Sequence, residues 1–335
     1  MKIKQGPFMS CTLVLLLFTA FLAGPKSQSD TNQAALRVWL DVSNSSILPM
    51  LSFQAVLHIK NTSTQAVTAN VSPSLYLSVR VGNGKWIPYY PDGVPIPTPA
   101  PPRMIRFSPG QELDFPVYID STSSEHSGDL LEHPGVVQVR VNWGPFQAEP
   151  ATITVLQPTG EDLAAFDELK RSGISKFFRT DFVDRYLESN ESREQSRKLA
   201  RNLKNEPVLT PMASEQATRM AQGASAENEL RAFIDRHPGS MYAKHARLAL
   251  ALMALEGASG PPDRKRAREI LTDLRMRNEL FTEATHYLGK LEEREGNRAQ
   301  AVTYFREATE SGTNPYYKTM ASWHLSRLTG TGKLK

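Results

Sequence analysis

Histidines and carboxylates come close together at one place in this sequence. His126 and His133 lie seven residues apart, and Glu125 and Glu132 directly precede them. Imidazole nitrogens and carboxylate oxygens are ligands for divalent metals, so this group could hold one. The surrounding "SEHSGDLLEHPG" is typical of a turn-rich loop, where such spacing also arises by chance. We therefore expect neither a metal nor a resident cofactor.

Three further histidines, His245, His286 and His324, lie in the C-terminal half. They stand at different offsets from the alanines that recur there, so they do not form a repeated set of ligands. Packing or surface positions explain them better. The chain has no G-x-S-x-G nucleophile motif, no H-E-x-x-H zinc motif and no dinucleotide-binding glycine pattern. We expect a non-enzymatic protein, with a hydrolase of unrecognised site as the catalytic alternative.

Two short motifs are better explained by ordinary structural roles than by binding of a phosphate or an anionic partner. "GTGK" at residues 330–333 is similar to part of a phosphate-binding loop, but such a loop needs a strand before it and a helix after it. We expect a frayed terminus there. The basic run "DRKRAR" at Asp263–Arg268 begins a predicted helix. It is more typical of a solvated helix face than of a site for an anionic partner.

Four aromatic residues of the N-terminal half offer another kind of chemistry. If exposed, their rings stack on sugar rings and bind a glycan, although core packing explains at least some of them equally well. They are Trp86, Tyr89, Tyr90 and Trp143.

Composition limits the class of protein. The 335 residues are 40% hydrophobic and 22% charged, as in ordinary globular proteins, and their length predicts two domains. The formal net charge of +4 is too small for a dedicated nucleic-acid-binding protein. We therefore expect no nucleic-acid partner.

The N-terminus has the pattern of an export signal. Lys2 and Lys4 precede an apolar stretch, Cys11 to Ala23, which is too short to span a bilayer comfortably. We predict a cleaved signal peptide over residues 1–28, with a single membrane anchor as the alternative. No other stretch approaches the roughly 20 apolar residues of a membrane span. The mature protein is expected to be periplasmic or extracellular, and without Cys11, the single cysteine, to have no disulfide.

Residues 34–156 alternate apolar and polar residues with the period of β-strands. "LSFQAVLHIKN" places Phe53, Ala55, Leu57 and Ile59 on one face. "LYLSVRVGNGKW" places Leu75, Leu77, Val79 and Val81 on one face, before a hairpin-type "GNG" turn. Six or seven such strands predict an antiparallel β-sandwich. "FSPGQELDFPVYI" and "HPGVVQVRVNW" each place Pro-Gly before an alternating strand. In this the segment resembles the immunoglobulin-like modules common in bacterial exported proteins.

The pattern changes to helical at residues 158–160, so we predict a helical domain over residues 160–335. Three segments within it share an internal spacing of four, four and one residues, at offsets of 38 and 37 residues. The aligned residues are Tyr242, Ala246, Leu250 and Ala251; Leu280, Ala284, Leu288 and Gly289; and Tyr317, Ala321, Leu325 and Ser326.

The middle segment resembles a tetratricopeptide repeat. Gly296-Asn297 is expected to end its first helix, and Arg298–Ser311 to form its second. We expect Gly289 to lie at a helix crossing that tolerates alanine but not leucine. The matching positions are Leu288, Gly289, Gly296, Ala301, Phe305 and Ala308.

The resemblance implies a tetratricopeptide-like α-solenoid with repeats from about residue 225. Such arrays hold a protein or peptide on a concave surface. We therefore expect an exported, non-enzymatic interaction or scaffold protein, with Tyr287, Lys290 and His324 as partner-binding candidates. The alternative function is glycan binding by the aromatic residues of the sandwich.

The predicted signal peptide can be tested directly. The mature chain is expected to begin between about Gly24 and Asp30, because small and polar residues follow the apolar core there. Intact-mass measurement of protein purified from the native host checks this. A mass that retains Met1 contradicts the prediction.

Overall fold

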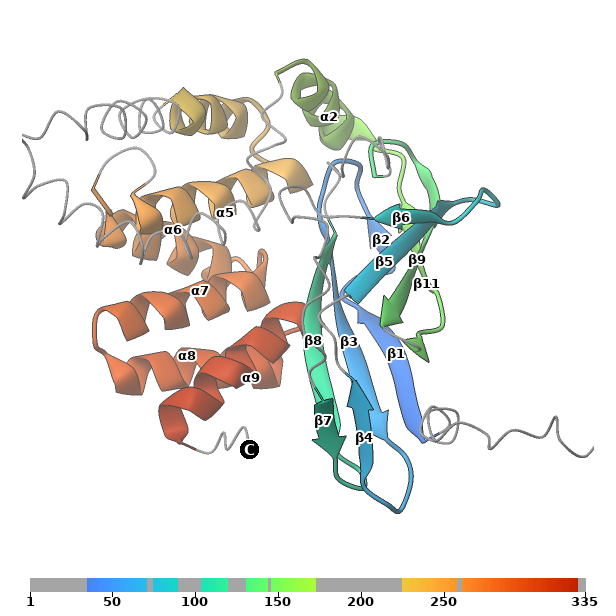
Figure 1. Ribbon diagram of the computed structural model, residues 1–335. Helices are drawn as coiled ribbons and strands as arrows, with labels where there is room; N and C mark the ends of the chain where they lie inside the picture. Colours follow the sequence, from blue (N-terminus) through green and yellow to red (C-terminus); the bar gives the residue numbers. More distant parts are fainter. Residues whose placement is uncertain are drawn as a thin grey trace, which may run out of the picture.

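The chain is a mixed β and α protein (Figure 1). The predicted signal peptide, residues 1–28, lies outside the part of the chain that the structure describes, as does much of the early helical region. The computed structural model describes residues 35–70, 75–89, 104–119, 131–143, 146–172, 225–257 and 261–330.

The strands form two larger sheets and one small one. The first sheet has the order β1-β3-β8, formed by β1 (Leu36–Val42), β3 (Phe53–Asn61) and β8 (Glu112–Ile119), and all its pairings are antiparallel. The small sheet pairs β4 (Val67–Asn70) with β7 (Met104–Phe107).

The second larger sheet has the order β2-β11-β9-β5-β6, and β10 (Phe146–Gln147) also pairs with β9. Its strands are β2 (Ser46–Ile47), β11 (Ala151–Val155), β9 (Gly135–Trp143), β5 (Leu75–Val81) and β6 (Ile87–Tyr89). β2 and β11 run parallel, so the prediction of purely antiparallel pairing was wrong at this one edge. The chain enters β2 from β1 of the other sheet, and this connection sets its direction.

Both larger sheets contribute to one hydrophobic core. Alternate residues of β9 enter it from the second sheet: Val137, Val139 and Val141. The face predicted for β3 is confirmed, since four of its residues are at most 1% exposed: Phe53, Ala55, Leu57 and Ile59.

The predicted hairpin after β5 is also confirmed, because β5 pairs antiparallel with β6. Leu77 and Val79 of β5 are buried as expected, but Val81 is 51% exposed. Val81 lies at the end of the strand beside the turn at Gly82, so its side chain extends past the core.

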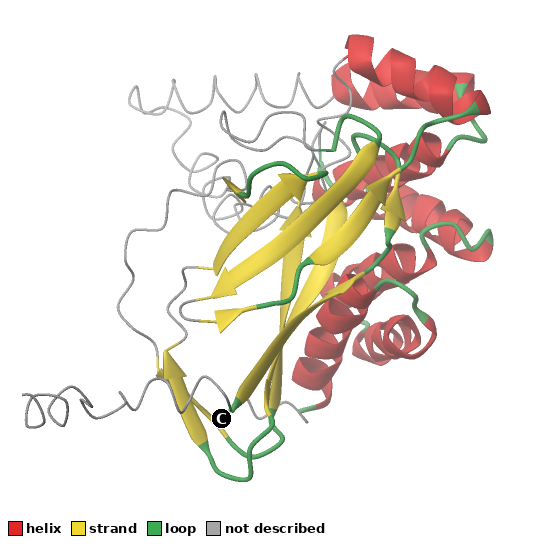
Figure 2. Cartoon of the chain, turned by 90° about the vertical axis from the view of Figure 1, so that its right-hand side faces the viewer, coloured by secondary structure: helices red, strands yellow, loops and turns green. Residues whose placement is uncertain are grey.

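The helices follow one another in a stack. α2 (Gly160–Ser172) comes first, and residues 225–236 are also helical. The helical array consists of α5 (Met241–Glu256), α6 (Arg264–Met276), α7 (Phe281–Arg294), α8 (Arg298–Ser311) and α9 (Pro315–Thr329). Each helix of the array packs against the next, and α7 also packs against α9. Figure 2 shows the strands as one body with the helices to one side.

Capping side chains mark where α5 and α6 begin. The Ser240 hydroxyl accepts a hydrogen bond from the backbone N–H of Ala243 at 3.0 Å and caps α5. Asp263 caps α6 in the same way, so the basic run begins a helix as predicted. Its Arg268 forms an ion pair with Glu292 of α7 at 2.8 Å, so this cation holds two helices together.

The predicted helix pair in the middle segment is confirmed in its boundaries. α8 spans Arg298–Ser311, and Gly296 ends α7 with φ at +81°, which favours glycine. Leu280 differs from the prediction. It precedes α7 with φ at +47° instead of joining the helical face that Tyr242 and Tyr317 occupy.

The array covers part of the outer face of the first sheet. α9 packs against β3 and β8, as Figure 1 shows. Val56 of β3 is therefore fully buried and Gln54 is only 9% exposed, although both point away from the core between the sheets. β3 is thus buried on both faces over half of its length, whereas alternation predicts one buried face.

The space for a side chain at Gly289 is smaller than the sequence predicts. A Cβ atom at this position would lie 2.7–3.0 Å from three ring atoms of Phe305. Phe305 is fully buried, and its ring stacks on His324 with centroids 4.7 Å apart. The ring cannot move aside freely, so the expectation that alanine is tolerated here needs correction.

We predict that Gly289→Ala lowers the stability of the full chain and that Gly289→Leu lowers it further. Overpacking costs about 1–3 kcal/mol, whereas the gain in helix propensity returns at most about 1 kcal/mol. Thermal unfolding of the full chain measures both. Ser326→Leu is the control, because Ser326 occupies the aligned position on α9, is half-buried, and should change stability by about 0.5 kcal/mol or less. A Gly289→Leu variant that melts at or above the parent temperature contradicts the prediction.

Candidate functional site at the junction of sheet and helices

The first sheet and the array meet through a buried polar contact. The Asn314 side-chain amide donates to Gln54 Oε1 and to Glu283 Oε1, each at 2.7 Å. The Gln54 amide in turn donates to the Tyr317 hydroxyl at 3.4 Å. Gln54 and Asn314 are 9% and 7% exposed. Buried amides are costly unless they are paired, so each of these two residues requires the other.

A second contact fixes the chain between β2 and β3. The Tyr242 hydroxyl of α5 donates to the carbonyl oxygen of Pro49 at 2.9 Å. Met50 and Leu51 pack with Tyr242 and Phe166 in one apolar cluster. Met50 has φ at +63°, and its N–H donates to the carbonyl of Leu131 at 2.8 Å.

Burial, followed by the charge of Asp162, raises the pKa of Tyr242, so its hydroxyl stays protonated as a donor.

A cavity of about 360 Å³, the junction cavity, lies between these two contacts. One wall comes from the chain around β2 and the start of β3, and the other from Asp162 of α2 and the N-terminal halves of α5, α7 and α9. Its surface combines apolar side chains with hydroxyl, amide and carboxyl groups. Its polar residues include Ser43, Asn44, Ser46, Ser52, Gln54, Asp162, His245, Glu283 and Asn314.

Burial shifts the pKa of Glu283 and of His245, two helix residues in the cavity wall. Burial raises the pKa of Glu283, and its hydrogen bonds to backbone and to Asn314 only partly oppose this. Burial, with a smaller effect of Lys244, lowers the pKa of His245 to about 4. His245 is therefore neutral near pH 7, and the ionised form of Glu283 is disfavoured.

Tyr287 is one of the three residues predicted to contact a partner. It is fully buried. Its ring packs edge-on against Tyr317 at a centroid distance of 5.7 Å, and the two hydroxyl oxygens are 3.5 Å apart. The prediction that Tyr287 contacts a partner is therefore corrected. Tyr287 lies on the side of α7 that faces α9, so α9 covers its side chain.

Lys290 and His324 are half-buried and lie near one another on α7 and α9. The Lys290 ammonium lies over the Tyr287 ring, 5.3 Å from its centroid. His324 Nδ1 is 3.2 Å from a carboxylate oxygen of Glu293. Burial lowers the pKa of His324, and the Lys290 charge lowers it further. The two residues thus form one patch on adjacent helices.

The other histidine of this region has a packing role. His286 is 2% exposed and is surrounded by Tyr287, Phe305, Tyr317 and His324. Burial lowers its pKa well below the ordinary value, so it is neutral.

The remaining predicted residues are only partly described. Glu125, His126 and Tyr90 lie outside the described residues, as do the side chains of Tyr89 and Trp143, and His133 is exposed. Trp86 carries the guanidinium groups of Arg80 and Arg140 over its ring, at 4.8 and 4.4 Å from the centroid. The two arginine side chains therefore already contact the Trp86 ring, on which a sugar would have to stack.

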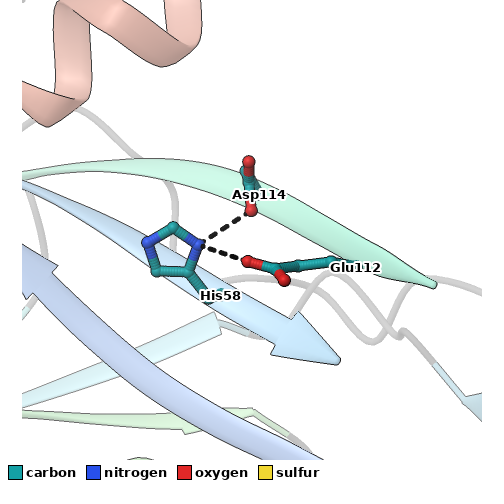
Figure 3. Close-up of side chains that lie close together, drawn as sticks. All are labelled: His58, Glu112 and Asp114. Carbon is teal, nitrogen blue, oxygen red and sulfur yellow. Dashed lines mark hydrogen bonds and ion pairs between the residues drawn. The ribbon is translucent and has the colours of Figure 1, made fainter. Parts of the chain in front are cut away.

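A group that the sequence analysis missed lies on the outer face of the first sheet. His58 of β3 meets Glu112 and Asp114 of β8, and within the described part of the chain these three residues form a set that could hold a metal ion (Figure 3). Burial alone would lower the pKa of His58, but the hydrogen bond and charge of Asp114, with Glu112 and Asp41, outweigh it and raise the pKa. The alternation of both strands places these residues on polar faces. Only the pairing of β3 with β8 brings them together.

Comparisons with known proteins do not assign a family. No protein-family model and no curated protein matches the chain. A β-glucosidase from Erythrobacter marinus matches with a TM-score of 0.24 and 15% identity, over 36% of this chain and 15% of that one. The DNA glycosylase AlkC from Pseudomonas fluorescens matches with a TM-score of 0.26 and 11% identity, over 38% and 33%. The sporulation control protein Spo0M from Bacillus subtilis matches with a TM-score of 0.23 and 16% identity, over 41% and 55%.

In each case the matched region is less than two thirds of the other protein. Likenesses this weak carry no argument about fold or activity. As to the membrane, none of the helices in the described ranges is both long and apolar enough to cross a bilayer.

We predict that Glu283→Gln changes how stability depends on pH. The folded chain holds the Glu283 proton more tightly than the unfolded chain does, since burial raises its pKa above the ordinary 4.5. Stability is therefore lost as pH rises above about 4.5 through the raised pKa. The glutamine keeps an oxygen for Asn314 and cannot ionise. The variant should match the parent in stability near pH 4 and be the more stable of the two at pH 8.

Urea unfolding of the full chain at several pH values measures this difference. Glu310→Gln is the control, because Glu310 is exposed on α8 and its replacement should leave the pH dependence unchanged. A Glu283→Gln variant that is less stable than the parent at pH 8 contradicts the prediction.

Proposed function

We propose that the protein is an exported, non-enzymatic binding scaffold that holds a peptide segment of a protein partner at the junction cavity. In this proposal the N-terminal strands are an immunoglobulin-like β-sandwich, and the helices are a tetratricopeptide-like array. The observation that carries the proposal is the cavity itself, which lies between the chain around β2 and β3 and the N-terminal halves of α5, α7 and α9.

The size and lining of the cavity suit part of a peptide. Small-molecule sites span roughly 300–1,000 Å³, and the 360 Å³ here is near the lower end. Its apolar wall, formed by Leu48, Leu51 and Leu248, can receive an apolar side chain. The hydroxyl groups of Ser46 and Ser52 and the carboxyl group of Glu283 can pair with a peptide backbone.

The surface beyond the cavity can extend such a contact. Lys290 and His324 lie further along α7 and α9, next to the ion pair between Glu293 and Arg327. A bound segment that leaves the cavity along these helices would meet both signs of charge. Tyr287 then supports the site from behind, because it contacts Tyr317, a residue of the cavity wall.

The test uses the full mature chain and a phage-displayed library of random 12-residue peptides. Selected peptides are expected to bind with micromolar Kd. Ser46→Trp should weaken them about tenfold or more, because Ser46 lines the cavity and is exposed, so a large side chain fills the entrance without burial strain.

Ser45→Trp is the matched control, because Ser45 is the exposed neighbour that does not line the cavity, and it should change Kd by less than about twofold. Selection of no peptide, or of peptides that bind Ser46→Trp as tightly as the parent, would overturn the proposal. The glycan alternative makes a different prediction: binding on a glycan array that Trp86→Ala abolishes and Ser46→Trp does not.

A further inference from the structure

The pairing of two strands gathers charged and imidazole side chains on one face. In the antiparallel register of β3 and β8, His58 lies opposite Asp114 and Lys60 lies opposite Glu112. Directly opposite residues place their side chains on the same face, with Cβ atoms about 4.5–5.5 Å apart. All four side chains are therefore on the outer face of the first sheet, beyond the half that α9 covers.

The donor atoms converge as metal ligands do. His58 Nδ1 is 2.8 Å from Asp114 Oδ1 and 3.3 Å from Glu112 Oε1, and the three ligand atoms lie within 4.8 Å of one another (Figure 3). Bonds of about 2.0–2.2 Å from Zn²⁺ to nitrogen or oxygen place tetrahedral ligand atoms roughly 3.3–3.5 Å apart. Small shifts of the side chains reach that geometry.

The neighbouring strand fixes the imidazole ring. Trp39 of β1 lies opposite His58 in the register, and the two rings stack with centroids 4.8 Å apart and planes 13° from parallel. The Arg37 guanidinium lies over the Trp39 ring at 5.1 Å. Stacking limits rotation of the imidazole, so Nδ1 remains directed at the two carboxylates.

A further partner orients one carboxylate and leaves an oxygen available. Lys60 Nζ is 3.2 Å from Glu112 Oε2, whereas Oε1 faces His58. Outer hydrogen-bonding partners of this kind orient metal ligands in many sites. Asp41 adds another negative charge near His58. The three carboxylates of Asp41, Glu112 and Asp114 thus outnumber the two nearby cations, Lys60 and Arg37, so the local charge favours a cation.

The group is also accessible to solvent. The side chains of His58, Glu112 and Asp114 are 15%, 34% and 39% exposed. A cation bound by these three ligands would keep a position for water, the arrangement of open zinc sites. We propose that His58, Glu112 and Asp114 bind a divalent cation, with Zn²⁺ as the expected ion because imidazole and carboxylate ligands together suit it.

The experiment is isothermal titration of ZnCl₂ into the full, metal-stripped chain. We expect the tightest site to bind one Zn²⁺ with micromolar Kd. His58→Gln should weaken that site by about 30-fold or more, and Asp114→Asn by about tenfold. Co²⁺ should occupy the same site and give a visible absorption band that His58→Gln removes.

His237→Gln is the matched control. His237 Nε2 is 2.9 Å from Glu168, a similar pair with one carboxylate and a neighbouring Arg236, so its loss should change Kd by less than about twofold. Circular dichroism confirms the fold of each variant, and Glu112→Gln replaces any variant that fails to fold. Absence of Zn²⁺ binding by the parent up to 1 mM, or equal binding by His58→Gln, would overturn the proposal.

Discussion

The hydrogen bond between Gln54 and Asn314 is the interaction on which the arrangement of the two halves depends. It joins a strand to a helix 260 residues further along the chain, in a place where both side chains are largely buried. An amide buried without its partner costs about 1–3 kcal/mol. Apolar contacts alone would allow the helices to slide across the sheet, whereas this paired contact, continued to Glu283 and Tyr317, fixes one position.

That position divides the outer face of the first sheet into two environments. Where α9 lies on the sheet, Val56 is buried and the junction cavity begins beside it. Two residues further along the same strand, His58 is partly open to solvent and faces two carboxylates. One strand thus contributes to two candidate binding sites of different chemistry.

Local features were predictable from the sequence because their causes are local. The alternation of β3, the turn after β5 and the limits of α8 follow from side-chain period and from glycine conformation. Features that depend on distant segments were not predictable. The burial of Val56 and of Tyr287 requires α9, and the group around His58 requires the register of β3 with β8. Alternation places these residues on a face but does not identify what covers it.

The apolar segment around Met50 and Leu51 has a consequence for how the chain is made. These residues are among the first to be synthesised in the described part of the protein, yet they pack against Phe166 and Tyr242. At about 5–20 residues per second, the ribosome reaches Tyr242 roughly 10–40 s after Leu51. Until Tyr242 has been synthesised, Met50 and Leu51 therefore lack part of the apolar cluster that buries them. A chaperone that binds the nascent chain could bind this segment during that interval.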